Sequence, residues 1–276
     1  MNKKDSLGNR MKDYENCYRL YLPKRQSIIV RCDMRAGHNF TKGFSRPYDA
    51  VFAKSMWETT KQLCENIGGC VFGYTQSDEI SLVLVDYKNI NAEPWFDNNL
   101  QKIVSVSASM ATYFFNKNFE EAIKDEYVDW YSTGTVNDKK RKLLNKHTQA
   151  YDSKLCVFDS RIFIVPREEV VNCLYWRQLD CVRNSIQSAG QANFSTRQLF
   201  KVKCNELQEK LFQEKNINWA RDYPAWFRNG VACYKRPTEI ATPDGKTITR
   251  GKWFLDTEIP MFSQNPDFIN KWVIFD

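Results

Sequence analysis

Three short apolar runs in the first third of the chain predict β-strands, because they are rich in β-branched residues and too short for helices. The first run covers residues 27–32 and ends at Asp33. The second and third, residues 70–72 and 80–85, flank the polar segment 73–79. Two apolar runs joined by a polar turn are typical of a β-hairpin. We therefore expect one strand, a connection, and then a hairpin.

The connection between the first strand and the hairpin is predicted to be a helix. Asp49 is a suitable N-cap, the apolar residues after it recur on one helical face, and Gly68-Gly69 is a stop signal. A strand–helix–strand connection makes the two strands parallel, so their carboxyl ends lie at the same edge of the sheet. Asp33 and Asp78 each follow such an end and are expected to meet there.

The pattern of the remaining chain predicts further helices and strands. Helices are expected over residues 6–19, 98–116, 168–187 and 196–214, and strands over residues 155–165, 231–234 and 252–255. Residues 118–154 are charged and show no clear period, which favours an insertion or a flexible basic loop.

The order strand, helix, strand, strand, helix, strand is the ferredoxin-like arrangement, which polymerase palm domains and nucleotide cyclases share. We predict an α+β fold, with an antiparallel or mixed sheet and helices on one face. Residues 1–190 would form the palm-type catalytic domain, with 27–86 as its strand–helix–hairpin core and 118–154 as the charged insertion. Residues 191–276 would form a C-terminal α/β extension packed on that domain.

Two carboxylates at adjacent strand ends are the ligands that a two-metal phosphoryl-transfer site requires. Neighbouring residues of a strand point to opposite faces, so Asp78 is the expected ligand and Glu79 only an assisting group. Ser and Asp are also common turn formers. The alternative that Ser77, Asp78 and Glu79 form a plain polar turn stays open at this point.

Composition narrows the class of protein. No apolar run in the 276 residues approaches the roughly 20 residues of a membrane span. The N-terminus lacks an apolar signal segment, and nine scattered cysteines with only two histidines favour free thiols in the cytoplasm over a zinc site. The net charge of +7 suits a polyanionic partner. The basic run Lys139, Lys140, Arg141 and Lys142 fits either phosphate contacts or a solvated helix face.

Six short motifs, spread over most of the chain in a fixed order, carry a family resemblance. They are LGNRMKDYE (7–15), VRCD (30–33), HNF (38–40), YTQSDE (74–79), FDSR (158–161) and WRQLD (176–180). With these motifs the chain resembles the tRNA-His guanylyltransferase superfamily of 3′-to-5′ nucleotide polymerases.

The resemblance implies a palm-domain enzyme with two Mg²⁺ ions, ATP and GTP or other nucleoside triphosphates as substrates, and tRNA as partner. It implies adenylylation of a tRNA 5′-monophosphate, followed by attack of the 3′-hydroxyl of a nucleoside triphosphate. A dimer or tetramer is also expected from the family. Asp33 and Asp78 match the metal-binding carboxylates, and Met34 stands where a glycine supplies its backbone carbonyl to a metal.

The resemblance also implies a nucleotide-binding set. It comprises Asp33, Met34, Arg35, Ala36, Gly37, His38, Arg46, Ser77, Asp78 and Lys102. Met34 replaces a glycine and would crowd the nucleotide, while Gly37 replaces an aromatic residue. Trp176 is interpreted as a core residue. Arg177 is interpreted as either a phosphate contact or a partner in a structural salt bridge.

One departure bears on the substrate. Residues 182–185 read Val-Arg-Asn-Ser, whereas members dedicated to tRNA-His carry His-Ile-Asn-Asn. The chain therefore looks more like the "-like protein" branch, which rebuilds 5′-truncated tRNAs against their own 3′ strand. A palm-type nucleotide cyclase and a catalytically weak RNA-binding protein remain as alternatives. Intact Asp33, Asp78 and Glu79 argue against the weak binder, because unneutralised carboxylates repel phosphate.

Overall fold

The computed structural model describes residues 6–153, 155–241 and 247–275. Its centre is a six-stranded sheet in the order β4-β1-β3-β2-β5-β6, in which every neighbouring pair is antiparallel. The strands are β1 (Ser27–Met34), β2 (Cys70–Gln76), β3 (Glu79–Leu84), β4 (Phe158–Val165), β5 (Val231–Ala241) and β6 (Thr247–Asp256). The α+β fold class with an antiparallel sheet is confirmed.

Strands β1 and β2 run in the same direction, because each pairs antiparallel with β3, which lies between them. Asp33 is the penultimate residue of β1, and Asp78 lies in the turn between β2 and β3. Both carboxylates therefore lie at the same edge of the sheet, as the strand–helix–strand order predicts. The two strands are parallel without being hydrogen-bonded neighbours.

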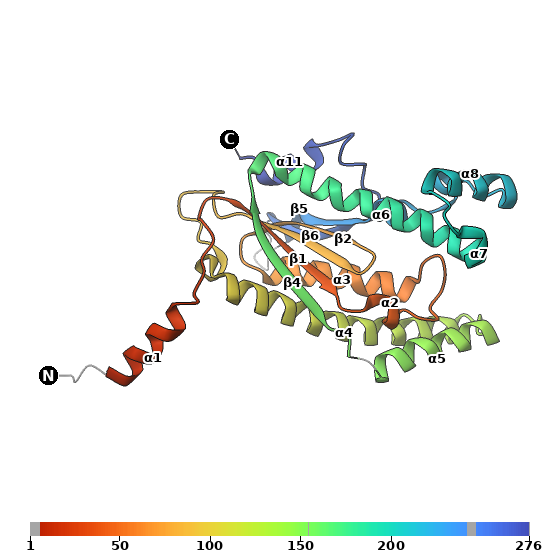
Figure 1. Cartoon of the computed structure of the whole chain (residues 1–276), viewed down its shortest axis with the longest axis horizontal. Helices are drawn as coiled ribbons and strands as arrows, with labels where there is room; N and C mark the ends of the chain where they lie inside the picture. Colours follow the sequence, from red (N-terminus) through yellow and green to blue (C-terminus); the bar gives the residue numbers. More distant parts are fainter. Residues whose placement is uncertain (1–5, 154, 242–246, 276) are drawn as a thin grey trace.

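Helices cover both faces of the sheet (Figure 1). On one face, α3 (Ala50–Asn66) and α4 (Leu100–Ser132) pack on alternate strand residues such as Val30 and Leu82. On the other face, α6 (Val170–Asn193) and α11 (Asp267–Val273) pack on the intervening ones. The core helices α3 and α4 thus share one face, as expected, and α6 and α11 add a second layer because apolar residues occupy both phases of the strand alternation and each phase needs a cover.

Over residues 118–153, the described part of the predicted insertion, the chain is mainly helical and not a flexible loop. Helix α4 continues to Ser132, and α5 (Asp138–Ser153) packs back along it. The apolar period fails at Asn118 because this buried side chain is satisfied by hydrogen bonds to Thr59 and Gln62 of α3 instead of by apolar packing. The shorter helices, 3₁₀ turns included, are α1 (Ser6–Asn16), α2 (Gly37–Phe40), α7 (Thr196–Leu199), α8 (Cys204–Lys215), α9 (Trp219–Asp222), α10 (Ala225–Asn229), η1 (Trp95–Asn98) and η2 (Arg167–Glu169).

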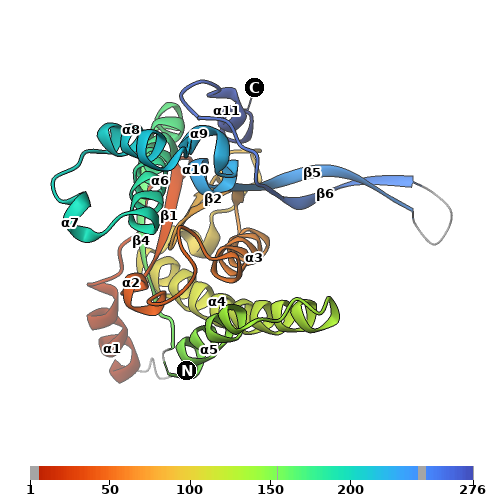
Figure 2. The same ribbon diagram turned by 90° about the vertical axis from the view of Figure 1, so that its right-hand side faces the viewer.

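The C-terminal strands extend the central sheet, since β5 pairs with β2. Beyond the body, β5 and β6 continue as a two-stranded ribbon (Figure 2). The sequence predicts only the inner ends of these strands, because the outer halves carry mainly exposed polar residues. Helix α6 runs across the predicted boundary at residue 190. The division at that residue stays a prediction.

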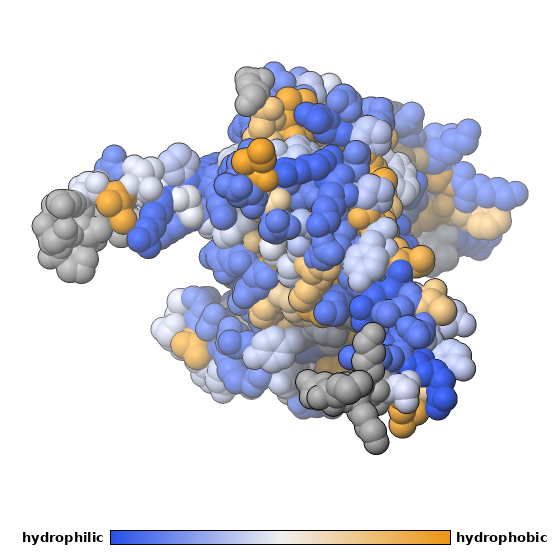
Figure 3. Space-filling view, turned by 90° about the vertical axis from the view of Figure 1, so that its left-hand side faces the viewer, coloured by the Kyte–Doolittle hydropathy of each residue, from blue (hydrophilic) through white to orange (hydrophobic). Residues whose placement is uncertain are grey.

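The surface that carries α1 is mostly hydrophilic, with scattered apolar residues (Figure 3). None of the helices among the described residues has the length and apolar character needed to cross a membrane. All nine cysteines are free thiols, as the sequence predicts.

Candidate active site

The two predicted carboxylates meet at the edge of the sheet. Asp33 lies opposite Glu79 in the β1–β3 register, and the Met34 amide donates a hydrogen bond of 3.0 Å to the Asp78 carbonyl oxygen. The hairpin turn is thereby fastened to the end of β1. Burial raises the pKa of the Asp33 carboxyl, and the negative charges of Asp78, Glu79 and Asp159 raise it further. The site is therefore a concentration of negative charge that a cation would relieve.

The donor set fits Mg²⁺. This ion prefers hard carboxylate oxygens and usually binds through one or two carboxylates plus substrate phosphates. Asp33 and Asp78 provide two such groups. Among the described residues, no group of three His, Cys, Asp or Glu side chains converges to hold a metal unaided. Phosphate oxygens would complete the coordination, and the role of the Met34 carbonyl stays a prediction.

The loop after β1 is shaped around Asp78. Ala36 has the left-handed conformation, with φ of 56°, and precedes the short helix α2. A Cβ atom at Gly37 would lie 2.2 Å from Oδ2 of Asp78, so any side chain there would displace the carboxylate. Because Gly37 has no side chain, the Asp78 carboxylate can occupy this position. Arg35 and His38 of the same loop are exposed.

Met34 does not crowd a nucleotide, contrary to the expectation from its replacement of a glycine. Its side chain is 3% exposed and belongs to the core beneath α3 and α4. We expect Met34→Ala to lower the free energy of unfolding by about 2–4 kcal/mol, because a buried Met truncated to Ala loses packing and leaves a cavity. Urea unfolding measures the effect, with exposed Met11→Ala as control. Equal effects of the two substitutions would contradict the assignment.

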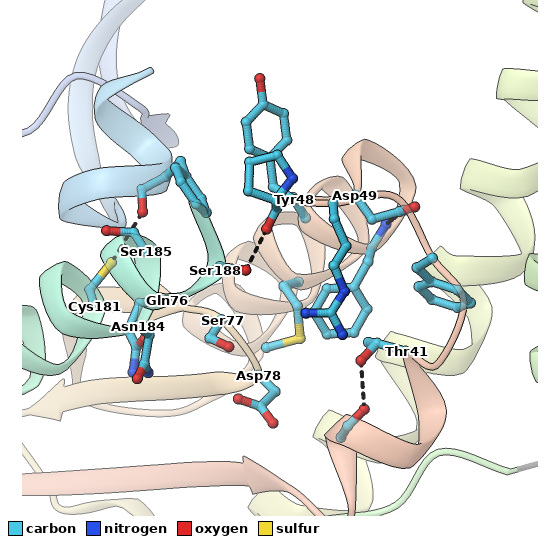
Figure 4. Close-up of a pocket in the computed structure, with 18 of the residues that line it drawn as sticks. Thr41, Tyr48, Asp49, Gln76, Ser77, Asp78, Cys181, Asn184, Ser185 and Ser188 are labelled. Atoms are coloured by element: carbon cyan, nitrogen blue, oxygen red, sulfur yellow. Dashed lines mark hydrogen bonds between the residues drawn. The ribbon is translucent and has the colours of Figure 1, made fainter. Parts of the chain in front are cut away.

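A cavity of about 380 Å³, here called the aromatic cavity, opens beside Asp78 (Figure 4). One wall carries Tyr48, Trp57 and Trp226, with ring centroids 4.7 Å apart for Tyr48–Trp226 and 5.1 Å for Trp57–Trp226. Polar side chains of α6 also line the cavity. They are Asn184, Ser185, Gln187, Ser188 and Gln191. A cavity that combines aromatic rings with polar groups suits a nucleobase.

Four residues of the predicted nucleotide set line this cavity together with Asp78. They are Gly37, His38, Arg46 and Ser77. Arg46 donates a hydrogen bond to Gln191 of α6, and Ser188 donates one of 2.7 Å to the Pro47 carbonyl oxygen. The segment 41–49 is thereby tied to α6. The resemblance-based grouping of these residues agrees with their positions.

A buried pair that the sequence does not predict supports the same segment. The Nε2 atom of His147 lies 2.9 Å from Oδ2 of Asp49. The Asp49 Oδ2 atom also accepts a hydrogen bond from the Ser45 amide, and its Oδ1 atom accepts one from the Phe52 amide. Burial alone would raise the pKa of the Asp49 carboxyl, but the hydrogen bonds and the charge interaction with His147 outweigh burial and lower it. Asp49 is thus the N-cap of α3, as predicted. His147, 98 residues away, has no local sequence signal.

Glu79 is not a free carboxylate. It accepts hydrogen bonds of 2.7 and 2.8 Å from Nε and Nη2 of Arg177, which also pairs with Asp180 at 2.6 Å. Both side chains of the Glu79–Arg177 pair are about nine-tenths buried. Arg177 therefore makes the structural salt bridge, and its assignment to RNA binding stays a prediction. Glu79 lies beside Asp33 on the neighbouring strand and is a positioning residue, because its carboxylate is already occupied by Arg177.

Lys102 lies away from the site. It is exposed in the first turn of α4, beside the Phe96 ring. Thr112 of the same helix accepts a hydrogen bond from the Phe158 amide, and Phe158 pairs with Met34 at the site edge. Ten helical residues correspond to about 15 Å along the axis. Within this chain the assignment of Lys102 to the nucleotide is wrong, because α4 begins at the opposite end of the sheet.

The basic run lies at the start of α5. Lys139, Arg141 and Lys142 are exposed, and Lys140 lies with its Nζ atom 4.9 Å from the Trp130 ring centroid. The run is a solvated helix face that is open to a partner. Its role in RNA binding stays a prediction.

A second pocket, of about 320 Å³ and here called the polar pocket, lies on the α6 face of the sheet. Gln76, Asp78 and Asn184 line both the polar pocket and the aromatic cavity. The other residues that line the polar pocket are Arg31, Asp33, Glu79, Arg161, Trp176 and Arg177. Trp176 is 51% exposed, so its interpretation as a core residue is wrong. Trp176 lies on α6 opposite the polar end of the sheet, where there is no apolar core for its side chain to pack into.

Comparisons with known proteins agree with this geometry. The family model described as tRNAHis guanylyltransferase matches residues 8–166. The bacterial tRNA(His) guanylyltransferase (Thg1)-like protein in complex with ATP is 38% identical, with a TM-score of 0.79 over 98% of this chain and 100% of that chain. The same kind of protein in complex with GTP is 35% identical, with a TM-score of 0.76 over the same shares.

A relative from Homo sapiens, the probable tRNA(His) guanylyltransferase, is 24% identical over 235 residues, which cover 80% of this chain and 69% of the relative. The fold, the ordered motifs and the carboxylates at the sheet edge thus agree with a family of nucleotidyltransferases. The chain belongs to the tRNAHis guanylyltransferase family.

Proposed function

We propose that this protein adds nucleotides to the 5′ end of tRNA in the 3′-to-5′ direction, directed by the opposing 3′ strand. The observation that carries the proposal is the position of Asp78, which lines both a nucleotide-sized cavity and a second, polar pocket, while Asp33 lines the polar pocket beside it. Two substrates could therefore approach this pair of carboxylates from two pockets. The ATP and GTP complexes of the bacterial relatives support nucleoside triphosphates as ligands.

The reaction needs two displacements at phosphorus. In the first, an oxygen of the tRNA 5′-monophosphate attacks the α-phosphorus of ATP, and pyrophosphate leaves. In the second, the 3′-hydroxyl of a nucleoside triphosphate attacks the activated 5′ phosphorus, and AMP leaves. Both steps depend on positioned oxygens and charge stabilisation more than on covalent catalysis by the protein.

The residues of the chain have separable roles in this proposal. The aromatic cavity binds the nucleotide, with its base toward Tyr48 and Trp226 and its phosphates toward Ser77 and Arg46. Asp33 and Asp78 would hold two Mg²⁺ ions, which would neutralise phosphate charge when bound. Glu79, held by Arg177, keeps β3 in place beside Asp33.

The substrate we favour is a tRNA that lacks its first nucleotide. Residues 182–185 of α6 depart from the His-Ile-Asn-Asn of members dedicated to tRNA-His, and Asn184 lines both cavities. Without that histidine, base pairing with the 3′ strand would select the nucleotide. The exposed basic residues at the start of α5 would contact tRNA phosphates. A cytoplasmic location and a dimer or tetramer remain expectations.

An extension assay tests the proposal. Purified protein with Mg²⁺, ATP and all four nucleoside triphosphates is mixed with 5′-monophosphorylated tRNA that lacks its first nucleotide. We expect a product one nucleotide longer, whose new nucleotide changes when the opposing 3′ nucleotide is changed. Unextended tRNA would contradict the proposal, and a cyclic nucleotide formed without RNA would favour the cyclase. If G is added whatever the opposing nucleotide is, nucleotide addition stands, and only the claim that the opposing strand selects the nucleotide is contradicted.

A further inference from the structure

Trp176 is a large aromatic residue with half of its surface exposed at the rim of the polar pocket. The guanidinium of Arg177 lies 4.4 Å from its ring centroid, and that of Arg31 lies 5.5 Å away. Arg177 is itself fixed by its ion pairs with Glu79 and Asp180. The indole therefore packs against a guanidinium that is itself held by ion pairs, and much of the ring still faces solvent.

Two buried polar atoms in the wall of the same pocket lack partners among the described residues. They are Nε of Arg31 and the side-chain oxygen Oε1 of Gln76. An unsatisfied buried donor or acceptor costs about 1–3 kcal/mol unless a ligand or water satisfies it. A donor and an acceptor in the wall of one pocket indicate a ligand that carries both kinds of group, as nucleotides do.

Charge also distinguishes the two cavities. Arg161 lies in the outermost strand, β4, with 54% of its side chain exposed and with contacts of 3.4 Å to Asp159 and 3.9 Å to Asp33. Arg31 and Arg161 can therefore bind phosphate close to the carboxylates. The aromatic cavity offers the rings of Tyr48, Trp57 and Trp226 to a mononucleotide, whereas the polar pocket offers the single open surface of Trp176. Such a surface suits the flat end of a nucleic-acid helix.

We propose that the polar pocket seats the 5′-terminal nucleotide of the RNA, with the Trp176 ring as its stacking surface and Arg31 and Arg161 near its phosphate. This inference rests on the proposed function, because it assigns the second substrate to the second pocket. Stacking on a fixed ring would place the 5′ phosphate beside Asp33 and Asp78 while the nucleotide occupies the aromatic cavity. Trp176 is thus a positioning residue for the RNA end.

The test uses a short acceptor-stem hairpin with a 5′-monophosphate and 2-aminopurine as its 5′-terminal base. Stacking on Trp176 should quench the fluorescence of the base when the wild-type protein binds, without any nucleotide present. We expect Trp176→Leu to weaken binding about tenfold and to abolish most of the quenching, since stacking on an aromatic side chain contributes this much per base. Trp176→Phe should retain most of both effects.

Phe212→Leu is the matched control, because Phe212 is 49% exposed on α8, outside the polar pocket. Its binding and quenching should equal those of the wild type. Wild-type binding and quenching in Trp176→Leu, with its thermal midpoint unchanged, would overturn the proposal. A loss in Trp176→Phe equal to that in Trp176→Leu would also overturn it, because stacking would not be the cause.

Failure of this inference is distinguishable from failure of the proposed function. If nucleotides are added but Trp176→Leu leaves the KM for the hairpin unchanged, the stacking assignment fails and the proposed function stands. If the hairpin stacks on Trp176 but no nucleotide is added by the wild type, the RNA-end site stands and the proposed function fails.

Discussion

Replacing Asp78 or Asp33 with asparagine is expected to reduce the rate of nucleotide addition about a thousandfold or more. Phosphoryl transfer depends on neutralising the phosphate charge, and the amide keeps the shape of the side chain while losing its charge. Single-turnover extension of 5′-labelled tRNA measures the loss. Asp97→Asn is the control, since Asp97 lies on the surface with 64% of its side chain exposed.

Asp33→Asn, which lowers activity, should raise the stability of the fold. The pKa of Asp33 is raised by burial and by neighbouring carboxylates, so the folded protein binds its proton more readily than the unfolded chain does. Above the raised pKa, the ionised Asp33 therefore lowers stability. Below the pKa of the unfolded state, that cost is absent. We expect Asp33→Asn to raise the thermal midpoint at neutral pH, with the gain shrinking as the solution is acidified.

Two observations would contradict this account of Asp33. Full activity of Asp33→Asn or Asp78→Asn would show that the carboxylates are not metal ligands. A lower thermal midpoint of Asp33→Asn at neutral pH would show that its charge stabilises the fold.

The sequence predicts the parts of the site that are set by local pattern and topology. Apolar alternation defines β1 and the β2–β3 hairpin, and the intervening helix makes β1 and β2 parallel. These facts alone bring Asp33 and Asp78 to one edge. Asp49 as an N-cap is equally local, since its side chain accepts a hydrogen bond from the Phe52 amide three residues later.

The parts that the sequence does not predict depend on how distant helices pack. His147 meets Asp49, and Arg177 meets Glu79, each across 98 residues. Trp176 adjoins Arg177 in sequence, yet one side chain is exposed and the other buried because of what each faces across the sheet. Neither the hydropathy of these residues nor their helical period distinguishes these environments.

Loss of the ion pair between Arg177 and Glu79 is expected to have a large effect on the free energy of unfolding. We expect Arg177→Met to lower the free energy of unfolding by about 3–5 kcal/mol, because it leaves a buried carboxylate without its partner. The flexible thioether chain fills part of the space, so the lost charge dominates. Urea unfolding at neutral pH measures the change. Arg183→Met is the matched control on the same helix, since Arg183 pairs with Asp180 while 58% of its side chain is exposed. It should cost less than about 1 kcal/mol.

A double variant separates the missing partner from lost packing. In Arg177→Met/Glu79→Gln the buried charge is gone, so stability should recover most of the loss seen in Arg177→Met alone. Equal stability of Arg177→Met and Arg183→Met, or no recovery in the double variant, would refute the buried-charge account.

The activity of Arg177→Met need not follow its stability, because Glu79 lies opposite Asp33 in the β1–β3 register. Released from Arg177, its carboxylate would add charge beside Asp33, so Arg177→Met should lose activity even at temperatures where it remains folded.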